Sequence, residues 1–241
     1  MLINPRSLET NLARLEEIEK ASMRLVTQAI YDFRETAALI FEKEKDKVAD
    51  IGEDITREAL DRIGVSRIDE RLFGKIDYKR ARYVFHPDYA LKQALFVDSK
   101  AEKISDRATA TIQTAQTSLR IRHLRRGLPT DEEGKLPSII ESHHTSYLTT
   151  TIIVKYHYAE LPGNAYTLEG TTIAALPNGM LQNIYNPSEM DTIWRTGRNA
   201  PTRGEAFRVR LVFGLLKQKM NWRVQTIPMP PQRFTWDDAA I

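Results

Sequence analysis

The chain has 241 residues, 41% of them hydrophobic and 28% charged, which is typical of a globular protein with one large domain or two small ones. Its lack of cysteine excludes disulfides, thiolate zinc sites and cysteine nucleophiles. The formal net charge of +3 is compatible with nucleic-acid binding but does not by itself argue for it, so the clustering of basic residues matters more than their number.

Apolar residues recur at helical spacing through the first quarter of the chain. Leu8, Leu12, Leu15 and Ile18 open the pattern, which predicts helices from residue 7 to residue 62. The charge run at 42–47 indicates a solvated helix end. Gly52 is interpreted as a break between two helices.

Two strand-like segments follow, at residues 75–85 and 93–101, around the turn-like stretch 86–89. They predict a β-hairpin, in which residues equidistant from the turn face each other. The midpoint between Asp77 and Asp98 falls between Pro87 and Asp88. We therefore expect Asp77 opposite Asp98, with Lys100 two residues further along on the same face.

Two carboxylates and one ammonium on one face can hold Mg²⁺ beside a scissile phosphate, which is the arrangement of a metal-dependent nuclease. Asp88 follows Pro87 and fits the usual Pro-Asp nuclease signature better than Asp77, which follows Ile76. However, roughly ten residues of strand would hold Asp88 about 30 Å from Asp98. The alternative to a metal site is a salt bridge in which Lys100 pairs with Asp77 or Asp98.

The remaining chain predicts a mixed sheet interrupted by one helix. We expect a helix at 106–119, an exposed loop or arm at 120–137 and a long functional loop at 177–203. The expected strands are 150–158, 171–176, 207–213 and 222–227. The prediction is a single α/β domain over 1–241, with a helical N-terminal region at 1–65 and a catalytic and DNA-reading core at 66–241.

Several ordered blocks resemble the SfiI-like type II restriction endonucleases of the PD-(D/E)xK nuclease superfamily. The blocks are Glu53–Thr56, Ile76–Arg80, Leu95–Ala101, Tyr185–Pro187, Arg203–Glu205 and Arg208–Arg210. The resemblance implies a restriction-endonuclease-like central mixed sheet flanked by helices. It also implies a homodimer or homotetramer that cleaves both strands of double-stranded DNA at a specific short palindrome, continuous or interrupted, with Mg²⁺.

Carried onto this sequence, the resemblance makes Asp77, Asp98 and Lys100 the catalytic set. Asp77 and Asp98 are then metal ligands, and the main-chain carbonyl of Ser99 is a third. Lys100 orients or deprotonates the attacking water and contacts the phosphate. The products would carry 5′-phosphate ends, and a cognate DNA methyltransferase would belong to the same system.

Arginines in the last third of the chain are candidates for reading DNA. In the 207–211 segment the apolar residues alternate with Arg208 and Arg210, whose side chains would project together and can reach guanine in the major groove. Arg203 could contact bases or phosphates, and Lys79, Arg80 and Arg82 are expected at backbone phosphates. The alternative is a solvated strand face. A second basic set could contact phosphates or be a simple charged loop: Arg120, Arg122, His123, Arg125 and Arg126.

Two other functions remain open from the sequence. A DNA repair or structure-selective nuclease could use the same site. The other alternative is a non-catalytic DNA-binding protein, against which the intact set of Asp77, Asp98 and Lys100 argues. No apolar run approaches the roughly 20 residues of a membrane span, and the N-terminus does not resemble a signal peptide, so we expect a cytoplasmic protein.

Overall fold

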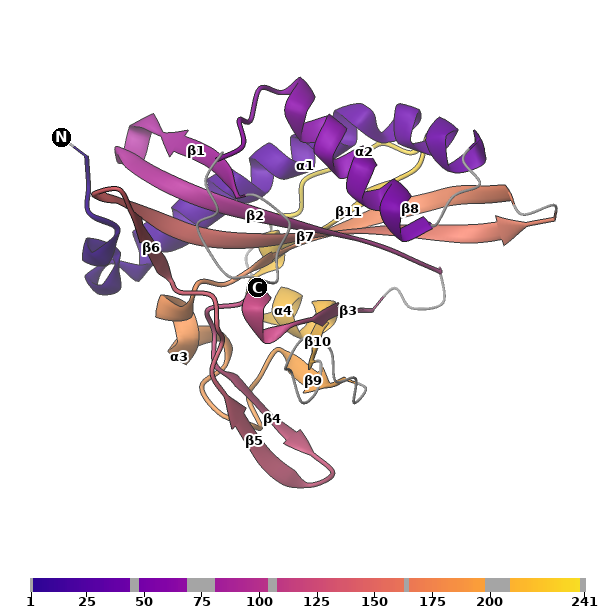
Figure 1. The fold of residues 1–241 in the computed structure, drawn as a ribbon. Coiled ribbons are helices and arrows are strands. Elements are labelled where there is room, and N and C mark those ends of the chain that lie inside the picture. The colour runs from indigo at the N-terminus through magenta and orange to yellow at the C-terminus, as the bar shows by residue number, and fades with distance from the viewer. Residues whose placement is uncertain are drawn as a thin grey trace.

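A mixed β-sheet forms the centre of the fold in the computed structural model, which describes residues 2–43, 48–68, 81–103, 108–162, 165–197 and 209–238 (Figure 1). Strands β2 and β7 are parallel, whereas the other neighbours in this sheet are antiparallel. The expected α/β fold with a central mixed sheet is therefore confirmed. The strand order is β1 (Arg82–His86), β2 (Leu91–Lys103), β7 (Thr145–Leu161), β8 (Ala165–Leu176) and β11 (Val224–Pro228), and β6 (Ile139–Ser142) also pairs with β7.

Two long helices, α1 (Leu12–Lys43) and α2 (Val48–Arg62), cover one face of this sheet after a 3₁₀ turn η1 (Pro5–Thr10) (Figure 1). The predicted helical N-terminal region is therefore confirmed. The predicted break at Gly52 is wrong, because Gly52 lies inside α2. A Cβ at this position would lie 3.2 Å from Cδ2 of the buried Tyr156, so glycine here allows α2 to approach β7 closely.

The other face of the sheet carries a second, three-stranded sheet in the order β3 (Thr109–Ile112), β10 (Val209–Val212) and β9 (Trp194–Thr196). The predicted helix at 106–119 is wrong over its described part. Ala110 and Ile112 are fully buried, whereas Thr109 and Thr111 are partly exposed, and this period of two suits a strand paired with β10. Strand β10, which we expected in the main sheet, belongs to this second sheet.

Short helices and 3₁₀ turns complete this part of the fold. They are η4 (Thr114–Gln116), η5 (Gly179–Leu181), α3 (Gln182–Tyr185), α4 (Phe213–Lys219) and η6 (Asn221–Arg223). The predicted long loop at 177–203 thus contains a 3₁₀ turn, one helical turn and strand β9. The predicted strand at 222–227 is confirmed as β11, at the edge of the main sheet.

A two-stranded hairpin of β4 (Ile121–Arg125) and β5 (Leu128–Glu132) projects from the body of the protein (Figure 1). We expected an exposed loop or arm here, and the structure shows an arm with regular strands. Arg126 and Gly127 connect the strands with φ values of 53° and 79°, as a two-residue hairpin turn of type I′ requires.

Apolar side chains fill both faces of the main sheet. One cluster lies between the sheet and the long helices and includes Phe33, Phe41 and Trp222. The other lies toward the second sheet and includes Trp194 and Leu211. Trp222 and Trp194 are therefore core residues.

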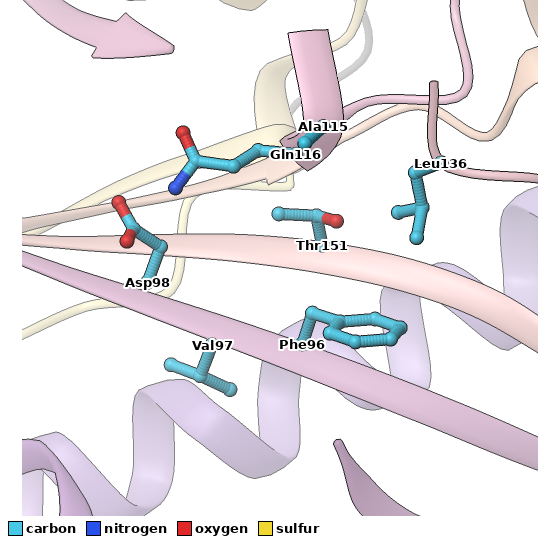
Figure 2. Close-up of a pocket in the computed structure, with 7 residues that line it drawn as sticks. All are labelled: Phe96, Val97, Asp98, Ala115, Gln116, Leu136 and Thr151. Atoms are coloured by element: carbon cyan, nitrogen blue, oxygen red, sulfur yellow. The ribbon is translucent and has the colours of Figure 1, made fainter. Parts of the chain in front are cut away.

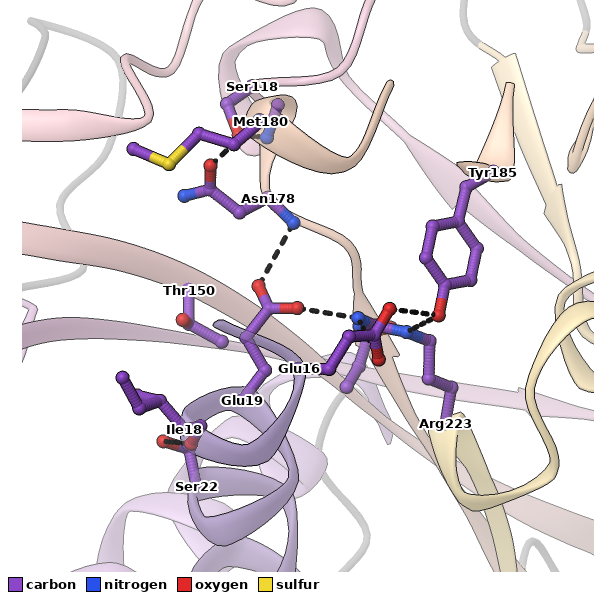
Figure 3. A network of polar contacts seen from close by, with 12 residues as sticks. Glu16, Ile18, Glu19, Ser22, Ser118, Thr150, Asn178, Met180, Tyr185 and Arg223 are labelled. Atoms are coloured by element: carbon purple, nitrogen blue, oxygen red, sulfur yellow. Dashed lines mark hydrogen bonds and ion pairs between the residues drawn. The ribbon is translucent and has the colours of Figure 1, made fainter. Parts of the chain in front are cut away.

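A buried ionic network ties α1 to the C-terminal part of the fold (Figure 3). The fully buried guanidinium of Arg223 lies 2.6 Å from Glu19 and 3.0 Å from Glu16. Its Nε donates to the Tyr185 hydroxyl at 2.7 Å, and the backbone N–H of Asn178 donates to Glu19 at 2.9 Å. Burial raises the pKa of Glu19 to about 7, although Arg223 opposes this shift.

Among the described residues, no helix is both long enough and apolar enough to cross a membrane.

Candidate active site

The predicted β-hairpin is present as β1 and β2, but its register differs from the prediction by two residues. Arg82 faces Leu95, whereas the predicted midpoint would place Arg82 opposite Gln93. The reason is the turn, in which a 3₁₀ turn η2 (Pro87–Tyr89) is followed by Ala90 with φ 49°, so its centre lies one residue later than expected. A shift of two residues preserves the face on which each side chain lies. Asp77 itself lies outside the described residues.

Asp98 and Lys100 lie on one face of β2, the face opposite the long helices. Strand β2 pairs with β7 through this region, with Asp98 opposite Ile153 and Lys100 opposite Lys155. The Asp98 side chain is 9% exposed and that of Lys100 is 19% exposed, and Lys100 Nζ lies 2.6 Å from Asp98 Oδ2. A nuclease site and a simple salt bridge would both place the ammonium and the carboxylate this close. The groups around the pair must therefore distinguish the two interpretations.

The Asp98 carboxylate lines a narrow recess between β2, β7 and η4. Figure 2 shows the carboxylate on the side of β2 away from the helices, facing the amide of Gln116. The recess is lined by Phe96, Val97, Asp98, Ala115, Gln116, Leu136 and Thr151. Four of the seven lining residues are apolar, so the recess shields the carboxylate from bulk water.

Sequence reasoning missed Gln116, because it assigned this segment to a helix. Gln116 closes the turn η4, in which its Oε1 accepts a hydrogen bond of 2.9 Å from the backbone N–H of Gln113. This bond holds the amide group beside the recess. Gln113 and Gln116 have the three-residue spacing of a capping box, but Gln stands where the usual sequence signature has Ser or Thr, so the local sequence gives only a weak signal for the turn.

The donor atoms at this site suit a hard cation. The Asp98 carboxylate and the main-chain carbonyl of Ser99 are oxygen ligands of the kind that Mg²⁺ prefers. The second predicted carboxylate, Asp77, lies outside the described residues. Within the described ranges no cluster of three His, Asp or Glu side chains could hold a metal by itself. Glu53 and Asp54, which belong to one of the resembling blocks, are exposed on α2, and Asp54 pairs with Arg57 at 2.5 Å.

A second lysine beside the site was also missed. Lys155 of β7 is fully buried, and its Nζ lies 2.7 Å from Glu102 Oε2 and donates to the Thr109 carbonyl oxygen at 2.5 Å. A lysine that alternates with apolar residues along a strand is ordinarily expected to face solvent. Its burial follows from the packing of the second sheet over this face of β7, which a local pattern does not specify.

The candidate DNA-reading strand β10 has the predicted alternation. Val209 and Leu211 are buried, and Arg210 between them is partly exposed. Arg210 faces Arg195 of β9, and its Nη1 lies 3.5 Å from Thr109 Oγ1. Arg203 and Arg208 lie outside the described residues, as do Lys79 and Arg80.

Some of the arginines that could contact DNA are engaged within the protein. The predicted phosphate contact of Arg82 is wrong: its side chain is buried and donates to Asp61 and to the Val65 carbonyl, both at 2.7 Å, so it joins β1 to the end of α2. On the β4–β5 arm, Arg120 and Arg122 lie 2.9 and 3.4 Å from Asp131. Arg126 is exposed in the turn at the tip of the arm.

Solved structures with the same arrangement are restriction endonucleases. The crystal structure of tetrameric SfiI bound to cognate DNA matches with a TM-score of 0.85 and 29% identity, over 100% of this chain and 94% of that one. The structure of BglI bound to its DNA recognition sequence matches with a TM-score of 0.74 over 93% of this chain and 94% of that one, and at 18% identity it shows a shared fold. The fold is therefore that of the restriction endonucleases.

The family follows from the sequence. The family model for the type II restriction enzyme SfiI matches residues 23–227. The type II restriction enzyme SfiI of Streptomyces fimbriatus is 32% identical over 231 residues, which cover 91% of this chain and 86% of that protein. The chain belongs to the SfiI family of type II restriction enzymes, as its sequence blocks predicted.

Proposed function

We propose that this protein is a Mg²⁺-dependent endonuclease that hydrolyses both strands of duplex DNA at a specific short palindrome. The observation that carries the proposal is the pair of Asp98 and Lys100 on one face of β2, with 2.6 Å between ammonium and carboxylate. Membership of the SfiI family favours this function over a simple salt bridge. An acid and a lysine at this spacing are the groups that phosphodiester hydrolysis needs.

In this proposal Asp77, Asp98 and the Ser99 carbonyl would hold Mg²⁺ through oxygen atoms. The bound ion supplies Lewis acidity and neutralises phosphate charge. The low exposure of the Asp98 side chain limits the competition of bulk water for its carboxylate.

Lys100 acts on the phosphate and on the attacking water. As an ammonium it donates a hydrogen bond to a phosphate oxygen on which negative charge develops and orients the attacking water, whereas as a neutral amine it would accept the proton of that water. The water oxygen bonds to phosphorus as the bond to the 3′ oxygen breaks, and that oxygen takes up a proton. The products carry a 5′ phosphate and a 3′ hydroxyl, without a covalent protein–DNA intermediate.

The second sheet would read the DNA. We assign base contacts to Arg208 and Arg210, with Arg203 beside them, and phosphate contacts to Lys79 and Arg80. A palindrome is cut on both strands by active sites related by a twofold axis, so the protein acts as a homo-oligomer. The tetramer seen in the crystal structure of SfiI favours a homotetramer over a homodimer. A cognate DNA methyltransferase would protect the host.

Digestion of a complex, unmethylated DNA with Mg²⁺, followed by sequencing of the fragment ends, tests this function. Discrete fragments are expected, and they should disappear with Asp98→Ala. Asp88→Ala is the matched control, because Asp88 lies in the turn at the far end of the hairpin and should not be needed. A smear that depends on Asp98 would instead identify a repair or structure-selective nuclease. Tight binding without cleavage would identify a non-catalytic DNA-binding protein.

A further inference from the structure

Lys155 brings a second ammonium into the immediate surroundings of Lys100. The two lysines are register partners on the parallel strands β2 and β7, and their side chains therefore project from the same face. The Lys155 side chain is 0% exposed, whereas that of its ion-pair partner Glu102 is 31% exposed. A charge is buried to this extent only when it is paired and hydrogen-bonded, and Lys155 meets this condition through Glu102 and the Thr109 carbonyl.

Glu102 is placed where it could interfere with Lys100. It lies two residues after Lys100 on β2, and Asp98 lies two residues before, so all three side chains share one face of the strand. Either acid could attract the Lys100 ammonium. The structure pairs Lys100 with Asp98 at 2.6 Å and Glu102 with Lys155 at 2.7 Å.

Lys155 also connects the catalytic strand to the second sheet. Its ammonium donates to the carbonyl of Thr109, the first residue of β3. Thr109 pairs with Val212 of β10, and its hydroxyl lies 3.5 Å from Arg210 Nη1. One buried ammonium therefore contacts both β2 and the strand that lies beside the candidate DNA-reading arginine.

We propose that Lys155 is a positioning residue for cleavage. Because it pairs with the Glu102 carboxylate, Lys100 stays paired with Asp98. The bond of Lys155 to the Thr109 carbonyl also holds Lys100 and Asp98 at a fixed distance from the second sheet. This inference rests on the proposed nuclease function. It adds a residue that would not touch DNA or metal and would act through Glu102 and Lys100.

Three variants test the proposal on the intact protein. Lys155→Met removes the ammonium and leaves Glu102 able to attract Lys100. The double variant Lys155→Met/Glu102→Gln removes both charges, which avoids an unpaired buried acid. Lys103→Met is the matched control, because Lys103 of β2 forms an ion pair of the same length, 2.7 Å, with Glu160 of β7, but 58% of its side chain is exposed.

Two quantities separate positioning from a structural role. The first is the single-turnover cleavage rate at saturating cognate DNA with Mg²⁺, and the second is the affinity for the same DNA with Ca²⁺ in place of Mg²⁺. We expect Lys155→Met to lower the rate by about 10- to 100-fold, as loss of an orienting neighbour typically does, while the affinity stays close to that of the wild type. The double variant should recover most of the rate, and Lys103→Met should match the wild type.

Wild-type cleavage by a folded Lys155→Met variant would overturn the proposal. A double variant as slow as Lys155→Met would also overturn it, because removing the charge of Glu102 would then fail to restore the cleavage rate. If Lys155→Met does not fold, the double variant decides alone, with near-wild-type cleavage supporting the proposal and slow cleavage refuting it. A wild-type protein that fails to cleave any DNA with Mg²⁺ would refute the proposed function itself, and this inference with it.

Discussion

Glu19 and Arg223 form an ion pair from which solvent is excluded, with 2.6 Å between Oε2 and Nη2 and no exposed side-chain surface on either residue (Figure 3). The pair joins α1 to the turn that precedes β11, two elements separated by most of the chain. Their attraction fixes the long helix against the sheet that carries the candidate active site.

Arg223→Met should therefore destabilise the protein strongly. It leaves the Glu19 carboxylate buried without its cation, and breaking a buried pair in this way typically costs about 3–5 kcal/mol of unfolding free energy. Urea denaturation followed by circular dichroism measures this loss. Arg24→Met is the control, because Arg24 pairs with Asp238 at 3.2 Å on the surface, and its loss should cost about 1 kcal/mol or less. Similar losses for both variants would contradict the role of the buried network.

His86 should make stability depend on pH. Burial lowers its pKa from the usual 6.5, and its hydrogen bond with Gln93 only partly opposes this. The unfolded chain therefore binds more protons than the folded protein below pH 6.5, so the contribution of neutral His86 to stability is lost as pH falls toward its lowered pKa. The unfolding free energy of the wild type should fall more between pH 7.5 and 5 than that of His86→Gln. Parallel pH curves for the two proteins would refute this prediction.

Two glycine substitutions in helices should have opposite effects. Gly52→Ala adds a Cβ at 3.2 Å from the Tyr156 ring, and this ring cannot move easily because it is buried and its hydroxyl bonds Thr56 at 2.9 Å. The crowding should exceed the gain in helix propensity and destabilise the fold by about 1–3 kcal/mol. Gly214→Ala in α4 meets no atom within 4 Å and should stabilise it by about 0.5–1 kcal/mol. Thermal unfolding of both variants measures the contrast, and a stabilised Gly52→Ala would disprove the close approach of α2 to β7.

Lys100→Met should abolish most cleavage while the protein still binds DNA. Removing a group that transfers protons or stabilises transition-state charge typically lowers the rate about 10²- to 10⁴-fold. Lys92→Met is the control, since Lys92 lies on the same strand within the hairpin and faces Phe85. Single-turnover kinetics with both variants measures the effect. Equal cleavage rates for the two variants would mean that Lys100 forms the ion pair with Asp98 but takes no part in cleavage.

Arg210→Ala should weaken binding to the cognate site more than binding to unrelated DNA. A bidentate contact of arginine with guanine is worth about 1–3 kcal/mol of discrimination, whereas a phosphate contact weakens all sequences alike. Binding titrations on both DNAs, repeated over a range of salt concentrations, distinguish the two. Lys217→Ala in α4, which removes a partner of Asp237 at 2.7 Å, is the control for loss of one positive charge. A uniform loss for Arg210→Ala would assign this residue to the phosphate backbone.

The sequence predicted those elements whose pattern is local and strong. The apolar spacing of α1 needs no information beyond one helix face, and the hairpin follows from two strand-like runs around one turn. Its register was wrong by two residues because the left-handed conformation of Ala90 extends the turn, and alanine gives no sign of it. Residues 109–112 were assigned to a helix because their strand state depends on pairing with β10, about one hundred residues later.

The same distinction applies to the candidate site. Asp98 and Lys100 were found because both belong to one strand and their spacing places them on one face. Gln116 and Lys155 reach the site from other elements, and only tertiary packing brings them there. Lys155 illustrates the limit, because a charged residue within a strand is assigned to the surface unless its buried partners are known.

The β4–β5 arm is closed at its base by two backbone hydrogen bonds, from Lys135 N–H to the Thr114 carbonyl at 2.9 Å and from Leu136 N–H to the Thr117 carbonyl at 3.1 Å. The chain thus leaves and re-enters the body at neighbouring points. A segment inserted in this way can change in length or be exchanged between relatives without altering the path of the chain elsewhere. Natural variation or engineering can therefore alter what the arm touches while the hydrolytic centre stays intact.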